Sequence, residues 1–497
     1  MDEIRKFLDK LKNGQQRIKP LEIAQSCRNL LFNAVKSIFA KKCEEVPQKA
    51  SLLELLDSPT VNEYLSNDAD IVNSLHYIRI LGSSAKQGLS VKKTESELAA
   101  KNLEYFNDYC EWKEQNISGS DVTSYPKMPY MSEANTRKLY IDLYLKEAGW
   151  DVMEKENIPS HSKAGIEIEV EGMPNSKGLG YCDYVLYGKD GRPLAVVEAK
   201  KTSVEPEKGR HQVELYGECM KAKYGYIPIL YYTNGYEIRC IDGIYPPRRL
   251  LAFHTESELE VLLQRRNRGD ITNIKINDNI TNRGYQKQAI TAICDRLNKK
   301  YRRGLLVMAT GTGKTRISIS LVDVLARSGW VKNVLFLADR TSLVSQAHSS
   351  FKDLLPEFPT CVLSENGKDK NIGARLMFST YQTMINYIDS EDKIFSTGRF
   401  DLILIDEAHR SIFNKYGTIF EYFDSFLIGL TATPKSDVDF NTYRIFNCES
   451  GEPNFAYGLE EAVKDKYLVP YKVINKTTKR LQRGFKYEEL SADERRQ

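Results

Sequence analysis

The residues with the clearest chemistry lie in the segment 308–315, which reads MATGTGKT. The segment follows the apolar run GLLV and precedes RISISLVDVLA, so it has the strand, loop and helix context of a phosphate-binding loop. Gly311 and Gly313 leave room for backbone N–H groups around phosphate oxygens, at a helix N-terminus whose dipole favours anions. The spacing predicts that Lys314 contacts the β- and γ-phosphates of ATP and that Thr315 contacts Mg²⁺.

The same loop contains Thr310 and Thr312, which we also predict to line the nucleotide. Met308 stands where the general pattern has its first glycine, and this is the one departure from it. The alternative interpretation is a glycine-rich turn with an incidental lysine, which the flanking strand and helix disfavour.

Two adjacent carboxylates, Asp406 and Glu407, follow the apolar run LILI and begin the sequence DEAH. They stand at the carboxyl end of a predicted buried parallel strand, which is where ligands bind in such sheets. Asp406 is predicted to hold Mg²⁺ and Glu407 to orient or deprotonate the attacking water, because in-line phosphoryl transfer needs metal and nucleophile on one side. The alternative is that the two acids cap a helix.

A third group of candidates consists of Asp183, Glu198 and Lys200. A period of two puts Glu198 and Lys200 on one face of their strand, and a hairpin can bring Asp183 beside them. Two carboxylates can share a Mg²⁺ that polarises a phosphodiester, while the lysine orients water or stabilises developing charge. An exposed, salt-bridged strand is the alternative for so common a pattern. The apolar residues before Glu198 favour a functional site, since an unpaired charge in a buried strand is costly.

Helices are predicted over the first part of the chain, where apolar residues recur at spacings of three and four, as at Ile23, Cys27 and Leu30. The glycines in GSSAKQG, residues 82–88, are expected to break one of these helices. We predict a helical accessory domain over residues 1–118, and a linker rich in serine, glycine and proline follows it.

An α/β domain is predicted over residues 125–245, because short alternating segments are separated by the turn signals Asp190-Gly191 and Asn234-Gly235. Residues 246–280 are predicted to form a linker with a bridging helix. Five near-continuous apolar runs then alternate with helices over residues 281–470, which indicates a parallel sheet covered on both faces. The predicted fold class is therefore multidomain, with an α domain followed by two α/β domains.

Composition narrows the class of protein further. The 497 residues include 71 Lys plus Arg and 67 Asp plus Glu, and the formal charge of +4 is too small to predict a nucleic-acid partner by itself. The nine cysteines are scattered without a C-x-x-C pair, which indicates reduced thiols. We found no apolar stretch long enough to span a membrane, and we expect a cytoplasmic protein.

The phosphate loop, DEAH and Thr431-Ala432-Thr433 resemble motifs I, II and III of a superfamily 2 helicase-type ATPase. The resemblance implies a RecA-like lobe over residues 281–470, in which Thr431 and Thr433 couple ATP hydrolysis to DNA movement. GYQKQAI, LADRTSLVSQ and STYQTM are similar to three further elements of that family. They imply that Gln286 reads adenine and that the DNA backbone is contacted by Arg340, Thr341, Thr380 and Gln382. Each of these four is equally compatible with an ordinary loop residue.

The group of Asp183, Glu198 and Lys200 resembles the core of PD-(D/E)xK nucleases, although Cys182 stands where the family name has proline. The resemblance extends to a Q-x-x-x-Y element and to a carboxylate on the preceding helix, which correspond to Gln212, Tyr216 and Glu133. Glu133 is accordingly a candidate metal ligand, and its alternative is an acid that favours a helix N-terminus.

A nuclease core that precedes a superfamily 2 motor is similar to the R (motor and endonuclease) subunit of a type I restriction enzyme. That resemblance implies ATP-driven translocation of double-stranded DNA and cleavage of unmodified DNA away from the recognition site, with Mg²⁺ and with methyltransferase (M) and specificity (S) subunits as partners. The alternatives are a type III restriction or repair helicase-nuclease, and a non-catalytic subunit that docks nucleotide and DNA. Type III relatives carry the nuclease after the motor, which disfavours the first of these.

Residues 471–497 are interpreted as the start of a connection to a missing second motor lobe, so we expect the chain to be an N-terminal fragment. Arginine fingers contribute about 10³ to 10⁵ in rate in related phosphoryl-transfer enzymes, and the fragment alone is therefore expected to be a weak ATPase.

Overall fold

The structure is a computed structural model of the 497-residue chain. Glu133 and the predicted connection at 471–497 lie outside the residues that it describes. The described residues are 2–13, 18–42, 44, 52–66, 68–86, 91–116, 137–153, 163–201, 204–235, 237–271, 273–364, 371–388, 394–408, 410–433, 440–449 and 451–470.

The N-terminal region is helical, as the apolar periodicity predicts. Its long helices pack on one another through buried side chains spaced three or four residues apart, such as Cys27, Leu31 and Ala34. The helices described here are α1 (Asp2–Lys12), α2 (Pro20–Lys41), α3 (Leu52–Leu56), α4 (Pro59–Tyr64), α5 (Ala69–Lys86) and α6 (Lys93–Asn116).

The helix α5 ends at Lys86, within the segment 82–88 that is expected to end it, although it continues through Gly82 itself. A Cβ atom on Gly82 would lie 2.4 Å from Cβ of Arg28 on α2. The glycine therefore permits two helices to approach closely, and this packing outweighs its low helix propensity.

A first, mixed sheet follows, with its strands in sequence order from β1 to β7. The pairs β1–β2 and β4–β5 are parallel and the other neighbours are antiparallel. The predicted turns hold Gly191 and Gly235, with φ of 74° and 86°, between β3 and β4 and between β5 and β6. The strands are β1 (Asp151–Met153), β2 (Lys163–Glu171), β3 (Leu179–Tyr187), β4 (Pro193–Ala199), β5 (Ile229–Thr233), β6 (Ile238–Ile241) and β7 (Arg248–Leu250).

The two faces of this sheet are covered differently. The helix α9 (Glu207–Tyr224) packs its Val213 and Met220 on one face, against Val185 and Val196. The opposite face packs on the π-helix η1 (Arg137–Ile141) and on α8 (Asp142–Glu147), and this core continues into the N-terminal helices. The side of the sheet that faces α9 is consequently the one on which polar residues can form a site.

The strand β7 lies past residue 245, where the sequence analysis starts the linker, and it pairs with β6 through Ile238 and Leu250. A strand of three residues is too short to show an alternating pattern. It leads into α10 (Glu256–Gln264), whose start is capped by a hydrogen bond of 2.9 Å from the backbone N–H of Thr255 to Glu258. The 3-10 turn η2 (Arg265–Asn267) follows α10.

A second sheet is parallel throughout, in the order β10-β11-β9-β12-β13-β8-β14. The five apolar runs of the sequence correspond to β8, β9, β11, β12 and β13, so the parallel sheet is confirmed. The short β10 and β14 were not predicted. The strands are β8 (Arg303–Met308), β9 (Val334–Ala338), β10 (Thr360–Val362), β11 (Leu376–Thr380), β12 (Leu402–Asp406), β13 (Phe426–Thr431) and β14 (Phe455–Tyr457).

Helices cover both faces of the second sheet, because successive side chains of each strand point to opposite sides. On β12, for example, Leu404 packs into one core and Ile403 into the other. The first core contains α11 (Gly284–Asn298), α12 (Lys314–Arg327) and α13 (Thr341–Leu354). The second contains α14 (Tyr381–Ile388), α15 (Arg410–Tyr422) and α16 (Phe440–Ile445), and α17 (Leu459–Lys464) follows β14.

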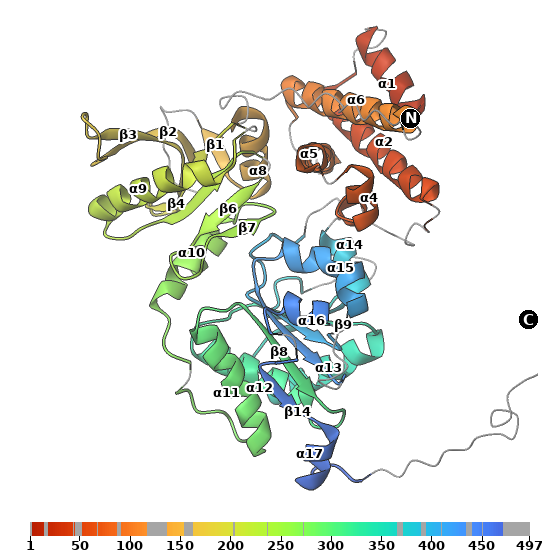
Figure 1. The fold of residues 1–497 in the computed structure, drawn as a ribbon. Helices are drawn as coiled ribbons and strands as arrows, with labels where there is room; N and C mark the ends of the chain where they lie inside the picture. Colours follow the sequence, from red (N-terminus) through yellow and green to blue (C-terminus); the bar gives the residue numbers. More distant parts are fainter. Residues whose placement is uncertain are drawn as a thin grey trace, which may run out of the picture.

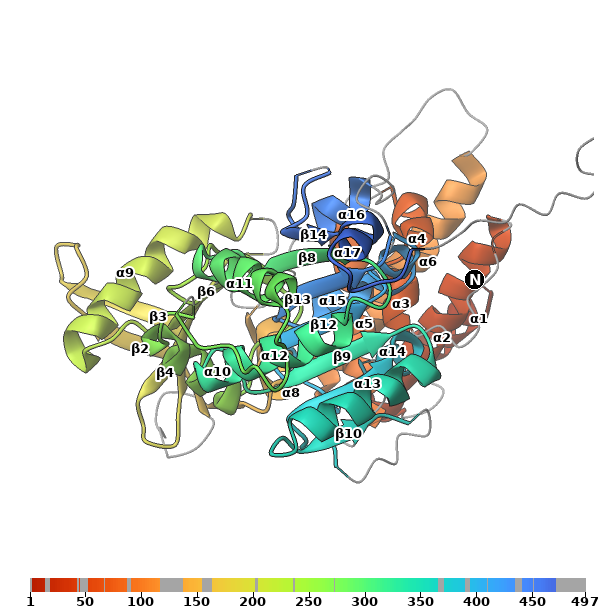
Figure 2. The same cartoon turned by 90° about the horizontal axis from the view of Figure 1, so that it is seen from below.

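The helical region and the first sheet lie side by side, and the second sheet with its helices forms a separate lobe below them (Figure 1). The view from below shows β9, β12, β13 and β8 next to one another across that lobe (Figure 2). In the described part of the chain, no helix is both long enough and apolar enough to cross a membrane.

Candidate active sites

The phosphate loop lies at the carboxyl end of β8, where the chain turns into α12. Gly311 and Gly313 have φ of 85° and 89°, in the left-handed region that favours glycine. A Cβ atom on Gly313 would lie 2.6 Å from the side-chain nitrogen of Gln286. Thr310 is exposed, whereas Thr312 is buried and its hydroxyl donates a 2.6 Å hydrogen bond to the carbonyl of Ala309. The loop therefore needs glycine at both positions, since a side chain at either would be strained.

The DEAH carboxylates lie at the same edge of the sheet, because only β13 separates β12 from β8. Nζ of Lys314 donates a 3.2 Å hydrogen bond to Oε1 of Glu407. Burial raises the pKa of Asp406, against the opposing effect of Lys314. Glu407 has φ of 55°, a costly conformation for a residue with a side chain, and such strain clusters at functional sites.

Gln286 is buried on α11 and reaches the loop from one side. Its Nε2 donates a 3.1 Å hydrogen bond to the carbonyl of Thr312, and the hydroxyl of Tyr285 donates one of 2.7 Å to the same oxygen. Tyr285 also stacks on Tyr457 with ring centroids 4.0 Å apart. The sequence analysis missed both tyrosines, although Tyr285 stands directly before the predicted glutamine. The adenine-reading role of Gln286 stays a prediction.

The proposed coupling residues lie between the two ATP motifs. Thr431 ends β13, is buried, and accepts a 3.1 Å hydrogen bond from the backbone N–H of Thr433. The backbone N–H of Ala408, in the DEAH loop, donates to the carbonyl of Leu430 at 2.9 Å. This hydrogen bond joins the two segments, so a shift of the DEAH loop would also move the end of β13.

The four candidate DNA contacts lie at the carboxyl ends of the neighbouring strands β9 and β11. Arg340 has a side chain that is 79% exposed, and Thr341 is exposed at the start of α13. Thr380 accepts a 3.2 Å hydrogen bond from the backbone N–H of Thr383, so it caps α14. Gln382 has a buried Nε2 without a hydrogen-bond partner among the described residues. Arg340 and Thr341 are the better placed pair for a phosphate backbone.

The structure brings the three candidate nuclease residues together on the α9 side of the first sheet. Tyr184 on β3 is in register with Val197 on β4, so Asp183 and Glu198 occupy the next positions of the two strands. Oδ2 of Asp183 accepts a 2.7 Å hydrogen bond from the backbone N–H of Ala199. Nζ of Lys200 forms an ion pair with Glu198, whose residue exposure is 2%. The hairpin geometry expected from the sequence is therefore present.

Gln212 and Tyr216 on α9 extend this group through a chain of hydrogen bonds. Lys200 donates to Oε1 of Gln212 at 3.0 Å, and Nε2 of Gln212 donates to the hydroxyl of Tyr216 at 2.8 Å. The hydroxyl in turn donates to the carbonyl of Tyr181 at 2.8 Å. Burial raises the pKa of Tyr216 to about 12, so its hydroxyl stays protonated and serves as a donor.

Two charged residues at this site were missed from the sequence. Arg137, on the π-helix η1, donates through Nη1 to Oδ1 of Asp183 at 2.7 Å and through Nη2 to Oε1 of Glu167 at 3.0 Å. Burial opposes the charge of Arg137, but Asp183 and Glu167 outweigh it and raise its pKa. Glu167 lies inside β2 with φ of 51°. An isolated arginine before an apolar helix gives no sequence signal that distinguishes it from a surface residue.

The donor sets at both sites fit Mg²⁺. Among the described residues, no group of three or more His, Cys, Asp or Glu side chains could hold a metal ion. Mg²⁺ does not need such a group, since it binds through one or two carboxylates and keeps several waters. Asp183 and Glu198 lie at adjacent positions of β3 and β4, whereas Asp406 ends β12 and Thr315 lies in the first turn of α12. All four side chains carry oxygen atoms of the kind that Mg²⁺ binds.

A buried network joins the first sheet to the second lobe. Arg248 on β7 donates through Nε and Nη2 to the two carboxylate oxygens of Asp424, each at 2.7 Å, and through Nη1 to Asp242 at 2.7 Å. Arg302 forms a 2.7 Å ion pair with Asp424, and His254 lies 3.1 Å from the same carboxylate. Asp424 therefore forms ion pairs with two arginines from different parts of the fold, Arg248 in the first sheet and Arg302 in the second lobe.

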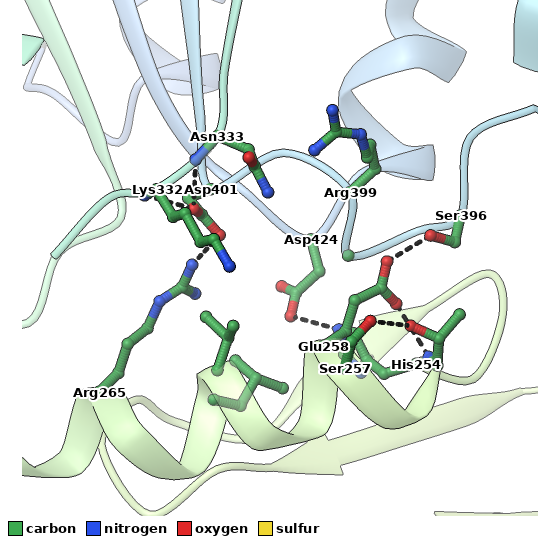
Figure 3. A pocket seen from close by; sticks show the side chains of 14 residues that line it. His254, Ser257, Glu258, Arg265, Lys332, Asn333, Ser396, Arg399, Asp401 and Asp424 are labelled. Carbon is green, nitrogen blue, oxygen red and sulfur yellow. Dashed lines mark hydrogen bonds and ion pairs between the residues drawn. The ribbon is translucent and has the colours of Figure 1, made fainter. Parts of the chain in front are cut away.

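Next to this network, α10 lines a pocket against the second lobe (Figure 3). Figure 3 shows Asp424 facing His254, and Arg265 extending from the end of the helix to Asp401. Asp401 also accepts hydrogen bonds from the backbone N–H groups of Lys332 and Asn333, at 2.6 and 2.7 Å. The polar lining is occupied by these contacts, so the pocket belongs to the junction between the two parts.

Two families match separate parts of the chain. Residues 167–249 match the N terminus of the type I restriction enzyme R protein, and residues 279–436 match the res subunit of type III restriction enzymes. The first match includes Asp183, Glu198 and Lys200, and the second includes the phosphate loop and the DEAH sequence.

Curated relatives agree with these matches. The chain is 31% identical over 356 residues to the EcoAI endonuclease subunit of Escherichia coli, an alignment that covers 66% of this chain and 42% of that protein. It is 27% identical over 450 residues to the EcoKI endonuclease subunit of Escherichia coli strain K12, covering 73% of this chain and 37% of the relative. Both relatives are type I restriction enzyme subunits, and the chain spans less than half the length of each.

A fragment described as an HsdR subunit of a type I restriction enzyme from Vibrio vulnificus YJ016 is 26% identical, with a TM-score of 0.31, over 68% of this chain and 61% of that one. The sequence matches extend through the first sheet and through the lobe that holds the phosphate loop. Over these segments the chain is similar to HsdR-type endonuclease subunits of type I restriction enzymes, with a helicase-like domain of the ResIII type.

Proposed function

We propose that the chain contributes the endonuclease and the first motor lobe of an ATP-dependent type I restriction subunit, which translocates double-stranded DNA and cleaves unmodified DNA away from the recognition site. The observation that carries the proposal is the presence of two separate hydrolytic constellations in one chain. The phosphate loop and DEAH residues meet at the edge of the parallel sheet. The nuclease group meets on the α9 face of the mixed sheet.

In the motor site, the residues supply charge and a base. Lys314 pairs with Glu407 in the structure, and the phosphates of ATP would be a stronger partner for the ammonium. Binding of ATP therefore releases Glu407, which can orient the attacking water. This exchange links substrate binding to the readiness of the base.

In the nuclease site, the pairing of charges positions the catalytic lysine. Glu198 and Gln212 hold the ammonium of Lys200 from two sides, so it is directed at the place where a phosphodiester oxygen would lie. Asp183 and Glu198 are the proposed carboxylate ligands. Bound Mg²⁺ would supply Lewis-acid polarisation of the phosphodiester and a site for the attacking water.

The domain order supports the type I assignment over a type III enzyme, because the nuclease constellation precedes the motor in this chain. A non-catalytic docking subunit is disfavoured by geometry, since it has no need to bring Asp183, Glu198 and Lys200 together. We propose M and S subunits as partners, duplex DNA as substrate, and the cytoplasm as the location.

Cleavage of plasmid DNA by the full-length polypeptide that carries this sequence, assembled with M and S subunits in the presence of ATP and Mg²⁺, tests the proposal. Glu198→Ala should abolish cleavage and leave ATP turnover intact, whereas Lys314→Ala should abolish both. Cleavage at the wild-type rate by the Glu198→Ala protein would refute the nuclease assignment. Unchanged DNA-dependent ATP turnover in the Lys314→Ala protein would refute the motor assignment.

A further inference from the structure

Arg137 occupies an unusual place in the proposed nuclease site. Its two terminal nitrogens reach two carboxylates, Asp183 at 2.7 Å and Glu167 at 3.0 Å. It comes from a π-helical turn, a rare conformation that is frequent at functional sites. The guanidinium therefore lies on one of the two carboxylates that we assign to the metal.

Arg137 and the backbone of β4 bond different oxygens of the Asp183 carboxylate. Oδ2 of Asp183 accepts the backbone N–H of Ala199, which ties that oxygen to β4. Oδ1 is the oxygen that Arg137 holds. A divalent cation at Oδ1 would have to approach a guanidinium at hydrogen-bond distance from the same atom, and like charges this close repel strongly.

Glu167 acts as the second anchor of the guanidinium. Ile166 and Ile168 on either side of it pair with Tyr184 and Cys182, so Glu167 lies opposite Asp183 across the two strands. Its φ of 51° is costly inside a strand, and its side chain is 50% exposed. Strain of this kind persists where the orientation of a side chain matters.

We propose that Arg137 competes with the divalent cation for Oδ1 of Asp183, and that Glu167 retains the arginine in this position until the cation displaces it. The inference rests on the proposed nuclease function and deepens it. Its consequence is a nuclease site that is electrostatically closed when the metal is absent, with Lys200 on Glu198 and Arg137 on Asp183. The site opens only when a divalent cation takes the place of the guanidinium.

Calorimetric titration of the full 497-residue chain with Mn²⁺, without nucleotide or DNA, measures this competition. The binding that Asp183→Asn removes from the wild-type isotherm defines the nuclease site. Arg137→Gln should bind Mn²⁺ at that site about tenfold more tightly than the wild type, as expected when one adjacent like charge is removed. Arg137→Lys keeps the charge but cannot bridge both carboxylates, so it should show a smaller gain.

Arg192→Gln is the matched control, because Arg192 is an exposed arginine beside Asp190 in a turn of the same sheet. It should bind Mn²⁺ as the wild type does. Equal or weaker Mn²⁺ binding by Arg137→Gln, with an unchanged thermal unfolding curve, would overturn the competition and make Arg137 a support for Asp183. If Arg137→Gln does not fold, Arg137→Lys decides, and equal or weaker binding there has the same meaning. Identical isotherms for wild type and Asp183→Asn would instead overturn the proposed metal site.

Discussion

At the scale of single residues, both proposed sites balance their own charges. Lys314 pairs with Glu407, Lys200 with Glu198, and Arg137 with Asp183. A buried charge without a partner is costly, so each cation stabilises a carboxylate that chemistry requires. A ligand that binds at either site must therefore displace one member of an ion pair rather than enter an empty space. Substitution of one member of a pair changes the contacts of the other member.

Lys314→Ala should lower the affinity of the chain for ATP by about 10- to 100-fold, because hydrogen bonds to charged groups contribute about 1.5–3 kcal/mol each. The substitution also leaves the charge of Glu407 facing the phosphates. Equilibrium titration with a fluorescent ATP analogue measures the change. Lys299→Ala, at an exposed position after α11, is the control and should bind as the wild type does. An unchanged dissociation constant for Lys314→Ala would exclude the lysine from phosphate binding.

Gln212→Ala tests the hydrogen-bond chain behind the catalytic lysine. The substitution removes one of the two groups that hold Lys200 and disconnects Tyr216. Supporting contacts around a metal site typically contribute about 10- to 100-fold to activity, and we expect a loss of cleavage in this range with unchanged ATP turnover.

Cleavage and ATP hydrolysis are measured on the same assembled complex. Glu218→Ala, on an exposed part of the same helix, controls for effects on α9 and should leave both rates unchanged. A Gln212→Ala protein that cleaves at the wild-type rate would show that Glu198 alone positions the lysine.

Candidate site residues can be predicted from the sequence when they lie close together in the chain and their types and spacing point to one chemistry. Gly311, Gly313 and Lys314 fall within one turn, and Glu198 and Lys200 share a strand, so short-range geometry suffices. Arg137 and Glu167 could not be predicted, because they meet Asp183 only after three separate segments have been assembled. The spacing between such residues carries no pattern.

At the scale of elements, the second sheet holds its site by close packing at the ends of its strands. Gly429 lies in β13, between the DEAH loop and α16. A Cβ atom there would lie 2.9 Å from Cβ of Ala408 and 2.4 Å from a ring carbon of Phe446. The strand needs a glycine because two neighbouring segments meet on it.

Gly429→Ala should therefore destabilise the protein by about 1–3 kcal/mol, the usual cost of overpacking a core. The shift of Ala408 should also weaken ATP binding, since Ala408 belongs to the DEAH loop. Denaturation by urea and nucleotide titration measure the two effects. Gly417→Ala, where an added Cβ meets no atom within 4 Å, should leave stability unchanged or slightly raise it. A Gly429→Ala protein as stable as the wild type would show that Phe446 and Ala408 move aside freely.

Elements were predictable where a run was long and apolar. The strands β8, β9, β11, β12 and β13 are buried on both faces, and each shows as a near-continuous apolar segment. The three-residue strands β7, β10 and β14 have no comparable signal. The segment 82–88 does end α5, but Gly82 itself lies within the helix, because glycine also allows helices to pack closely and here it meets the side chain of Arg28.

At the scale of the whole molecule, the proposed ATP site and the junction with the first sheet lie at opposite ends of the strands of the second sheet. The ATP residues lie at the carboxyl ends of β8, β12 and β13. Arg302, Asp401 and Asp424, which face the first sheet and α10, lie one or two residues before the amino ends of these strands. Strands of five or six residues span about 17–20 Å. The first sheet is thus fixed to the same strands that carry the proposed ATP site.

Asp424 is the centre of this junction. Burial opposes its ionisation, but Arg248 and Arg302 outweigh that cost and hold the pKa of Asp424 well below its ordinary value. A carboxyl group whose pKa is depressed on folding stabilises the folded state above its unfolded pKa of about 3.9, and this stabilisation is lost as the pH falls towards the folded pKa. Asp424 therefore favours the folded chain at neutral pH and weakens it only in strong acid.

Asp424→Asn should lower the free energy of unfolding by about 3–5 kcal/mol at neutral pH, because two buried guanidinium groups lose their shared counter-charge. The two arginines belong to different parts of the fold. Loss of the Asp424 charge should therefore also separate the unfolding of the first sheet from that of the second lobe. Trp150 lies in the core shared by the first sheet and the N-terminal helices, and Trp330 lies in a core of the second lobe, so the two indoles report these parts separately.

Variants that retain one of these two tryptophans, with the others replaced by phenylalanine, make the separation measurable by fluorescence during urea denaturation. In the wild type, both probes should change at one urea concentration. In Asp424→Asn they should change at two. Asp190→Asn removes an exposed carboxylate from a surface pair and should leave the transitions coincident, because such pairs contribute about 0–1 kcal/mol. Coincident transitions in Asp424→Asn, at the wild-type midpoint, would show that apolar contacts and the Arg265–Asp401 pair join the two parts without Asp424.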